Sequence, residues 1–208
     1  MKKQIKIQTI IFDIGNVLVD FNFSEIFHRY AADEAIYQKI VEATVHSSAW
    51  NEFDKGVWSD EKILGAFIQN DPSVEQELRD IFTHLEGMIQ QRTETIPWIH
   101  ALKAQGYQVL YLSNFPQRTY LMNYEAMNFI QEMDGGILSY QEKEIKPEEP
   151  IYRLLIEKYN LIPEACVFLD DVENNLVTAR KLGMQTILFT NKEEAVAELS
   201  KVGVYCKE

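Results

Sequence analysis

An apolar segment near the start of the chain, residues 8–13, ends in one acidic residue, Asp13, with Gly15 and Asn16 directly behind it. A short, nearly continuous apolar run is typical of a strand that is buried on both faces of a parallel sheet, because helices cover both sides of such a sheet. In open α/β sheets, ligands bind outside the carboxyl ends of the strands. The segment therefore predicts a central strand that brings the Asp13 carboxylate to a functional edge.

Helical and extended patterns alternate in the chain after residue 91. Four further segments are typical of strands, at 107–113, 135–140, 166–171 and 184–189. Helical patterns lie between them, one of them at 117–130. Strands that alternate with helices imply right-handed crossovers and a parallel sheet with helices on both faces. We therefore predict an α/β fold with a doubly wound, mostly parallel, Rossmann-like sheet.

Residues 23–91 show helical periodicity instead, with little that indicates a strand. Ser59 suits the start of one helix, and Ser73 begins a capping-box pattern that suits the start of another. A chain of 208 residues is long enough for one α/β core and one modest insertion. We predict that residues 21–91 form a helical cap inserted into a core made of 1–20 and 92–208.

The charge and the composition narrow the expected partners. A formal net charge of −12 disfavours nucleic acid and anionic membranes, since both need a basic surface. Asp13 and Asn16 interrupt the apolar N-terminal stretch, so we expect neither a signal peptide nor a membrane span. Two cysteines far apart in sequence, Cys166 and Cys206, suggest a reduced cytoplasm. The sequence carries no prediction of oligomeric state.

Polar side chains follow several of the predicted strands, where parallel strands would bring them to one edge. They are Asp13, Ser113 with Asn114, Lys146 before Pro147, and Asp170 with Asp171. Each has an ordinary structural role by itself, such as capping a helix or forming a loop. Carboxylates from separate strands repel one another at one edge unless a proton or a cation lies between them. Oxygen ligands favour Mg²⁺, which also binds phosphate.

Four short motifs in this order resemble those of the haloacid dehalogenase-like hydrolases. They are FDIGN at 12–16, LSN at 112–114, IKP at 145–147 and FLDD at 168–171. The resemblance extends from about residue 8 to residue 190 and depends on the order and spacing of the motifs. It implies a hydrolase with an α/β core and a cap.

The resemblance also implies a role for each matching residue. Asp13 would be the nucleophile that forms an aspartyl-phosphate, which water then hydrolyses. Ser113 and Asn114 would hold phosphate oxygens, and Lys146 would supply positive charge to the phosphate and to Asp13.

Mg²⁺ is the cofactor that the resemblance implies. Asp13, Asp171 and the main-chain carbonyl of Gly15 would bind the ion. Asp170 and Asn175 would support the site by orienting Asp171 or the waters of the metal.

Gly15 departs from the usual pattern, because most phosphatases of this superfamily carry a second aspartate there as general acid and base. Such a group contributes about 10²- to 10⁴-fold to the rate. One explanation is a substrate that leaves easily, such as an anomeric sugar phosphate, an aryl phosphate or an acyl phosphate. FDIGN followed by a helical cap resembles a subgroup of sugar-phosphate phosphatases, including α-glucose-1-phosphate phosphatase, that share this glycine. A second explanation is a replacement acid, either Asp20 or a cap residue such as Asp54.

A third explanation is a metal-independent 2-haloacid dehalogenase, which also lacks the second aspartate. The acidic pair Asp170 and Asp171 favours metal and phosphate over this alternative. A catalytically silent member that binds phosphate or a protein is a further alternative. We predict a Mg²⁺-dependent phosphomonoesterase for a small phosphorylated metabolite, with sugar phosphates among the candidates. We expect the cap aromatics Trp50, Phe53, Trp58 and Phe67 to form mainly cap core.

Overall fold

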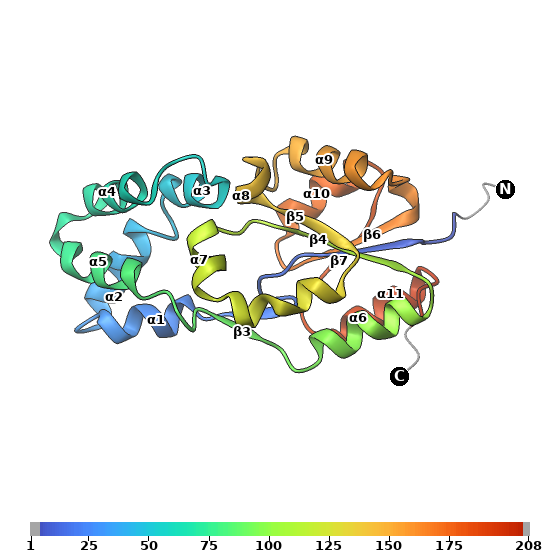
Figure 1. Cartoon of the computed structure of the whole chain (residues 1–208), viewed down its shortest axis with the longest axis horizontal. Helices are drawn as coiled ribbons and strands as arrows, with labels where there is room; N and C mark the ends of the chain where they lie inside the picture. The colour runs from blue at the N-terminus through green and yellow to red at the C-terminus, as the bar shows by residue number, and fades with distance from the viewer. Residues whose placement is uncertain (1–4, 206–208) are drawn as a thin grey trace.

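The computed structural model describes residues 5–205, so Cys206 and the first four residues lie outside it (Figure 1). Its main sheet has five strands in the order β5-β4-β1-β6-β7, and every adjacent pair is parallel. These strands are β1 (Thr9–Phe12), β4 (Gln108–Ser113), β5 (Gly135–Leu138), β6 (Cys166–Asp170) and β7 (Gln185–Leu188). The predicted α/β class and parallel sheet are confirmed.

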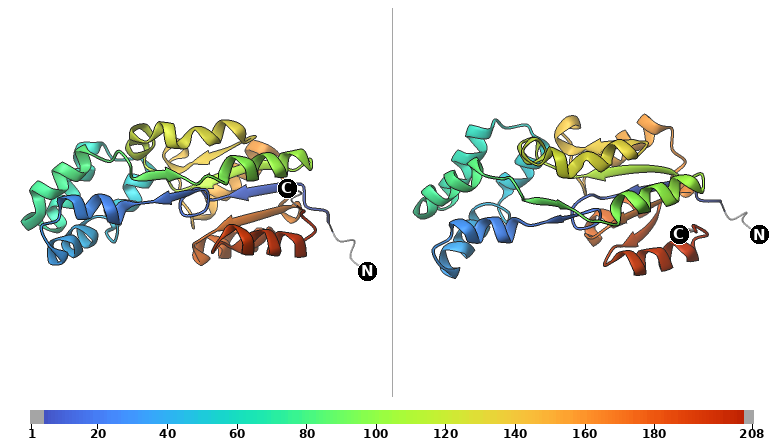
Figure 2. Two further views of the ribbon diagram at one scale, coloured as in Figure 1. Left: turned by 90° about the horizontal axis from the view of Figure 1, so that it is seen from below. Right: turned by 60° about the horizontal axis from the view of Figure 1, so that its bottom comes forward.

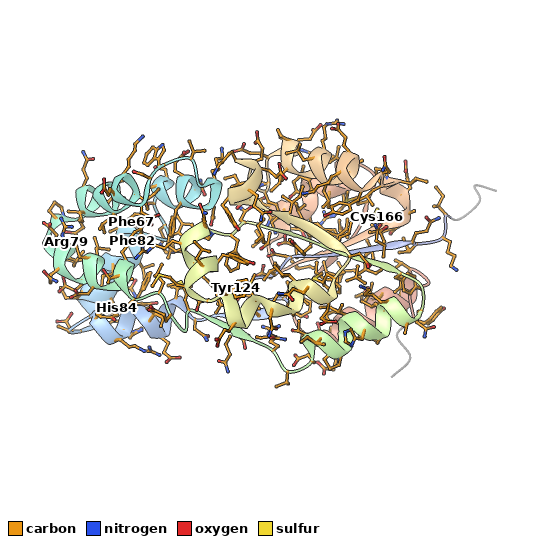
Figure 3. The ribbon with its side chains drawn as sticks, viewed as in Figure 1. Phe67, Arg79, Phe82, His84, Tyr124 and Cys166 are labelled. Carbon is orange, nitrogen blue, oxygen red and sulfur yellow. The ribbon has the colours of Figure 1, made fainter. Side chains whose placement is uncertain are left out.

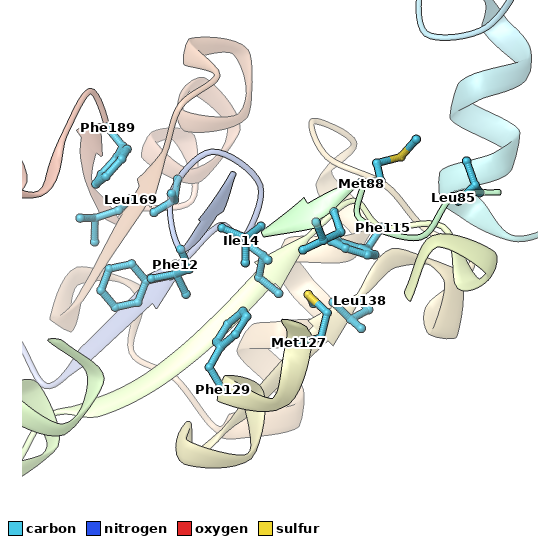
Figure 4. Close-up of a cluster of buried hydrophobic side chains, with 14 of the residues drawn as sticks. Phe12, Ile14, Leu85, Met88, Phe115, Met127, Phe129, Leu138, Leu169 and Phe189 are labelled. Carbon is cyan, nitrogen blue, oxygen red and sulfur yellow. The ribbon is translucent and has the colours of Figure 1, made fainter. Parts of the chain in front are cut away.

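Strand β1 lies at the centre of the sheet, as its apolar sequence predicts. Ile10, Ile11 and Phe12 have no exposed surface. Alternate side chains of a strand point to opposite faces, so Ile10 and Phe12 join one hydrophobic cluster and Ile11 joins the other. Figure 4 shows part of the first cluster, in which Phe12 lies with Phe129, Leu169 and Phe189.

Helices cover both faces of the sheet (Figure 1). The cluster around Phe12 includes residues of α6 (Thr95–Ala104), η2 (Tyr124–Glu132) and α11 (Lys192–Lys201). The cluster around Ile11 includes residues of α9 (Glu149–Tyr159) and α10 (Glu173–Lys181). The remaining short helical elements of this part are α7 (Gln117–Met122), α8 (Ser139–Glu142) and η3 (Pro163–Ala165). Helices therefore cover both faces of the sheet and leave the ends of its strands uncovered.

Six helical elements between β2 and β3 gather at one end of the molecule (Figure 2). They are α1 (Phe23–Tyr30), α2 (Glu34–Ala43), α3 (Ser48–Lys55), α4 (Asp60–Asn70), η1 (Pro72–Val74) and α5 (Glu75–Thr83). Phe53, Phe67 and Phe82 pack against one another inside this group, and Figure 3 labels the last two. Phe53 and Phe67 are therefore core side chains, as expected. The boundaries of the cap as a domain stay a prediction.

Two features of this segment differ from the expectation. A two-stranded antiparallel ribbon, β2 (Val19–Phe21) with β3 (Ile89–Gln91), connects the helices to the sheet. Ser59 caps α4 by accepting a hydrogen bond from the Lys62 backbone, as predicted. Ser73 does not start a helix, because Asp71 caps the short turn η1 and α5 begins at Glu75.

Within residues 5–205, no helix has the length and apolarity needed to cross a bilayer.

Candidate active site

A cavity of about 170 Å³ opens at the carboxyl edge of the sheet, between the ends of β1 and β6 and helix α3. Its lining comes from the predicted strand-end motifs together with the ribbon and the helical cap. The lining residues are Asp13, Gly15, Asn16, Phe21, Trp50, Asp54, Asn114, Phe115, Pro116, Asp171 and Val172. Trp50, which we expected to be mainly cap core, lines this cavity.

Strand register accounts for the meeting of the two acidic motifs. Phe12 of β1 pairs with Leu169 of β6, so the next residues, Asp13 and Asp170, are neighbours across the sheet. The backbone N–H of Asp13 also donates to the carbonyl of Leu169 at 2.8 Å. Because each acid directly follows an apolar strand, the parallel pairing places both at the same edge.

Lys146 lies between these two acids. Its Nζ is 2.8 Å from Asp13 Oδ1 and 2.7 Å from Asp170 Oδ2, and its side chain is 1% exposed. Burial alone would lower the pKa of Lys146, but the carboxylates of Asp13 and Asp170 outweigh it and raise that pKa. Lys146 is therefore a permanent positive charge inside the site.

Asp170 is completely buried and fully engaged by its neighbours. Besides the ammonium of Lys146, its carboxylate accepts hydrogen bonds from the Asn175 amide at 3.0 Å and from the Val172 backbone at 2.8 Å. The carbonyl of Asn175 is held in turn by the hydroxyl of Tyr152 at 2.8 Å. Asn175 thus holds the carboxylate of Asp170 in place, and Asp170 in turn holds the ammonium of Lys146.

The third acid, Asp171, faces the cavity beside Asp13. Asp13, Asp170 and Asp171 each have an oxygen within 4.8 Å of the others. The Asn16 amide, on a residue with φ of +55°, donates to Asp171 Oδ2 at 3.1 Å. Because hydrogen bonds already occupy the oxygens of Asp170, Asp13 and Asp171 are the carboxylates best placed to hold a divalent cation. Hard oxygen donors of this kind fit Mg²⁺.

The protonation of Asp13 depends strongly on charge in the site. The pKa of Asp13 is raised to about 7, because burial and the charges of Asp170 and Asp171 outweigh the lowering effect of Lys146. Burial also raises the pKa of Asp171. A cation between these carboxylates favours their charged forms. The charged acids are therefore more stable side by side with a cation than without one.

Ser113 and Asn114 occupy the end of β4, next to the cavity. Ser113 is 1% exposed. The Asn114 side chain holds the backbone of Lys146 from both sides: its oxygen accepts from the Lys146 N–H at 2.8 Å, and its amide donates to the Lys146 carbonyl at 2.9 Å. Asn114 therefore positions Lys146, while the predicted contacts of Ser113 and Asn114 with phosphate stay predictions.

Gly15 leaves open space where the usual second acid would stand. A Cβ added to Gly15 would meet no other group within 4 Å, apart from its chain neighbours. Of the two replacement acids that the sequence suggested, Asp20 forms an ion pair with Arg92 at 2.7 Å and does not line the cavity. Asp54 lines it, and burial raises the pKa of Asp54 to about 8 against the lowering effect of Lys146.

Sequence reasoning missed Ser139, which joins two walls of the site. Its hydroxyl accepts from the Phe115 backbone at 2.8 Å and donates to the Asp54 carbonyl at 2.6 Å. Ser139 lies in α8, outside the four motifs, so motif spacing offers no signal for it.

Comparisons with known proteins agree with this architecture. A family model described as haloacid dehalogenase-like hydrolase matches residues 7–183. Flavin mononucleotide hydrolase 1 of Arabidopsis thaliana is 22% identical over 204 residues, covering 96% of this chain and 79% of that protein. The phosphorylated carbohydrates phosphatase of Thermotoga maritima is 21% identical over 201 residues, covering 86% of this chain and 83% of that protein. The chain spans 36% or less of the length of several other curated relatives that it matches.

Solved structures show the same fold. A predicted HAD-like family hydrolase from Porphyromonas gingivalis superposes with a TM-score of 0.73 at 22% identity, covering 94% of this chain and 97% of that one. The HAD family enzyme bt-2542 of Bacteroides thetaiotaomicron, in complex with magnesium and inorganic phosphate, gives 0.67 at 20% identity, covering 89% and 94%. L-2-haloacid dehalogenase of Xanthobacter autotrophicus gives 0.65 at 15% identity, covering 95% and 84%.

Proposed function

The chain belongs to the haloacid dehalogenase-like hydrolases, and we propose that it is a Mg²⁺-dependent phosphomonoesterase that acts through an aspartyl-phosphate at Asp13. The observation that carries the proposal is the group of three carboxylates at the cavity, with Lys146 bound to two of them. A metal-independent dehalogenase has no need of Asp171 beside Asp13. A divalent ion and a phosphate group give that pair of acids a function.

In the proposed reaction, a carboxylate oxygen of Asp13 attacks phosphorus, and the bond from phosphorus to the leaving oxygen breaks. Lys146, 2.8 Å from Asp13 Oδ1, balances the negative charge of the nucleophile and of the incoming phosphate. Asp13, Asp171 and the Gly15 carbonyl would hold Mg²⁺, which would supply positive charge to the phosphate oxygens. Water then attacks phosphorus, which frees Asp13 and releases inorganic phosphate.

The shape and lining of the cavity support a small substrate. Its volume of about 170 Å³ lies below the roughly 300–1,000 Å³ of pockets for drug-sized ligands, which favours a compact substrate. Phe21, Trp50 and Phe115 add apolar side chains to the lining of the cavity. Two relatives, named as a flavin mononucleotide hydrolase and a phosphorylated carbohydrates phosphatase, support a phosphate ester as substrate, with sugar phosphates among the candidates.

Phosphate release from a panel of sugar, nucleotide, aryl and acyl phosphates, with Mg²⁺ and with excess chelator, tests the proposal. We expect hydrolysis that the chelator abolishes and that Asp13→Asn and Asp171→Asn each reduce by more than 10²-fold. Asp20→Asn is the matched control, since its carboxylate is 47% exposed and lies outside the cavity lining. Halide release from 2-haloacids that persists in chelator, or binding of phosphate without turnover, would refute the proposal.

A further inference from the structure

We propose that Asp54, in the last turn of α3, is the catalytic acid and base that replaces the carboxylate missing at Gly15. The inference rests on the proposed phosphatase function and assigns a proton donor to it. Gly15 supplies no carboxyl group to the cavity. The helical cap supplies one, Asp54, which lies outside the four sequence motifs.

Asp54 is an unusual carboxyl group for its surroundings. It is 7% exposed, and it lines the same cavity as Asp13. Among residues 5–205, its backbone carbonyl accepts a hydrogen bond, but no group donates one to its carboxyl oxygens. A buried carboxyl without a partner opposes folding, so its presence beside a reactive centre indicates a function in the reaction.

Three successive residues tie the end of α3 to the core. The Asp54 carbonyl accepts from the Ser139 hydroxyl at 2.6 Å. Lys55 pairs with Glu148 at 2.9 Å, and the Gly56 carbonyl accepts from the Lys143 ammonium at 2.7 Å. The Asp54 backbone is therefore fixed relative to α8 and the loop that follows it. A residue that transfers a proton to a substrate oxygen needs such a fixed position.

The turn after Asp54 also packs too closely for a side chain. Gly56 has φ of +61°, and a Cβ there would lie 3.0 Å from the Cβ of Tyr140. This close approach brings the C-terminal end of α3 against α8. The carboxyl of Asp54 is thereby held at the cavity instead of at the solvent surface.

The local environment keeps Asp54 in the form that a proton donor needs. Burial raises the pKa of Asp54 to about 8, so the carboxyl carries a proton at neutral pH. Phe21, Trp50 and Phe115 contribute apolar side chains to the lining of the same cavity. An acid in such surroundings transfers its proton when charge develops on the leaving oxygen.

The proton balance closes over two steps. When Asp13 attacks phosphorus and the ester bond breaks, protonated Asp54 gives its proton to the leaving oxygen, which departs as an alcohol. Asp54 is then a carboxylate. In the second step it accepts a proton from the attacking water as the new oxygen–phosphorus bond forms and the Asp13–phosphorus bond breaks. Phosphate is released, and both residues return to their starting forms.

Leaving-group dependence of the first turnover separates this role from a structural one. Rapid mixing of Asp54→Asn with an alkyl phosphate should show a first turnover about 10²- to 10⁴-fold slower than wild type. The first turnover of 4-nitrophenyl phosphate should stay within about tenfold, because nitrophenolate leaves without a proton. Later turnovers of that ester should be slow, since water activation is lost. Asp20→Asn should match wild type with both esters.

A rescue variant guards against a local structural effect of Asp54→Asn. In that background, Gly15→Asp restores a carboxyl where an added Cβ has free space, and the alkyl-phosphate turnover should rise about 10-fold or more. Equal slowing of both esters by Asp54→Asn, or no slowing of either, would overturn the role of Asp54 alone. A wild-type protein inactive on every ester would overturn the proposed function, and this inference with it.

Discussion

Replacing Lys146 by methionine removes an ammonium that lies between two buried carboxylates. Methionine keeps a long apolar side chain, so the change is mainly electrostatic. Breaking a buried ion pair from one side costs about 3 to 5 kcal/mol, because a charge is left uncompensated. Asp170 retains its hydrogen bonds from Asn175 and Val172, whereas Asp13 loses the ammonium that lowers its pKa.

The loss should depend on pH in a definite direction. With Lys146 present, the pKa of Asp13 is already raised to about 7, mainly by burial, and the removal of Lys146 should raise it further, because Lys146 lowers it. A carboxyl whose pKa is higher in the folded than in the unfolded state stabilises the fold less as pH rises through its folded pKa. The variant should therefore lose more stability at pH 8 than at pH 5.

Urea denaturation in excess chelator measures this loss directly. We expect Lys146→Met to reduce the free energy of unfolding at pH 8 by about 3 to 5 kcal/mol. Lys158→Met is the matched control, since Lys158 pairs with Glu142 at 3.3 Å and its side chain is 46% exposed. That control should lose about 1 kcal/mol or less. Equal losses in the two variants, or equal losses at pH 5 and pH 8, would refute the electrostatic account of the site.

Two further predictions concern the metal and Gly15. Mg²⁺ at about 100 times its dissociation constant should stabilise the wild type by about 2.7 kcal/mol in thermal unfolding, and Asp171→Asn should lose this shift. An unchanged melting temperature in the wild type would contradict the Mg²⁺ site. Gly15→Asp alone should raise alkyl-phosphate turnover by less than about tenfold, because Asp54 already supplies the acid. A gain near 10²-fold would argue that no acid is in place.

The sequence predicted that the acids of two strands meet at one edge of the sheet, because local patterns determine where each strand ends. Asp13 and Asp170 each follow an apolar run, and parallel pairing of two such runs aligns their ends. The register that pairs Phe12 with Leu169 leaves the acids no other place than one edge of the sheet. The residue types, their order and the parallel topology are sufficient for that inference.

Elements set by tertiary contacts escaped the same reasoning. The single helix expected at 117–130 divides at Asn123, because that side chain binds the Gly87 N–H and the Leu85 carbonyl, each at 2.9 Å. These contacts join segments more than 30 residues apart. The helical periodicity on both sides of Asn123 does not predict these hydrogen bonds. Hydrophobic spacing indicates which side chains are buried and not which groups they bind.

The contact that holds the Asp54 backbone could not be predicted for a related reason. Ser139 and Asp54 are 85 residues apart, and they meet only because α3 of the cap packs against α8 of the core. The sequence offered Asp54 and Asp20 as equal candidates for the missing acid, since nothing in their spacing separates them. In the structure Asp20 pairs with Arg92 outside the cavity lining, whereas Asp54 lines the cavity, and this difference favours Asp54.

Moving the acid from the strand loop to the helical cap changes what controls the reaction. An aspartate at Gly15 would share a loop with the nucleophile and would be present whatever the cap does. Asp54 depends on the contacts of Ser139 and Lys143 with α3, so the same bonds that dock the helix also place the acid. In the proposed reaction, enclosing the substrate and transferring a proton to the leaving oxygen would then both require α3 in this position.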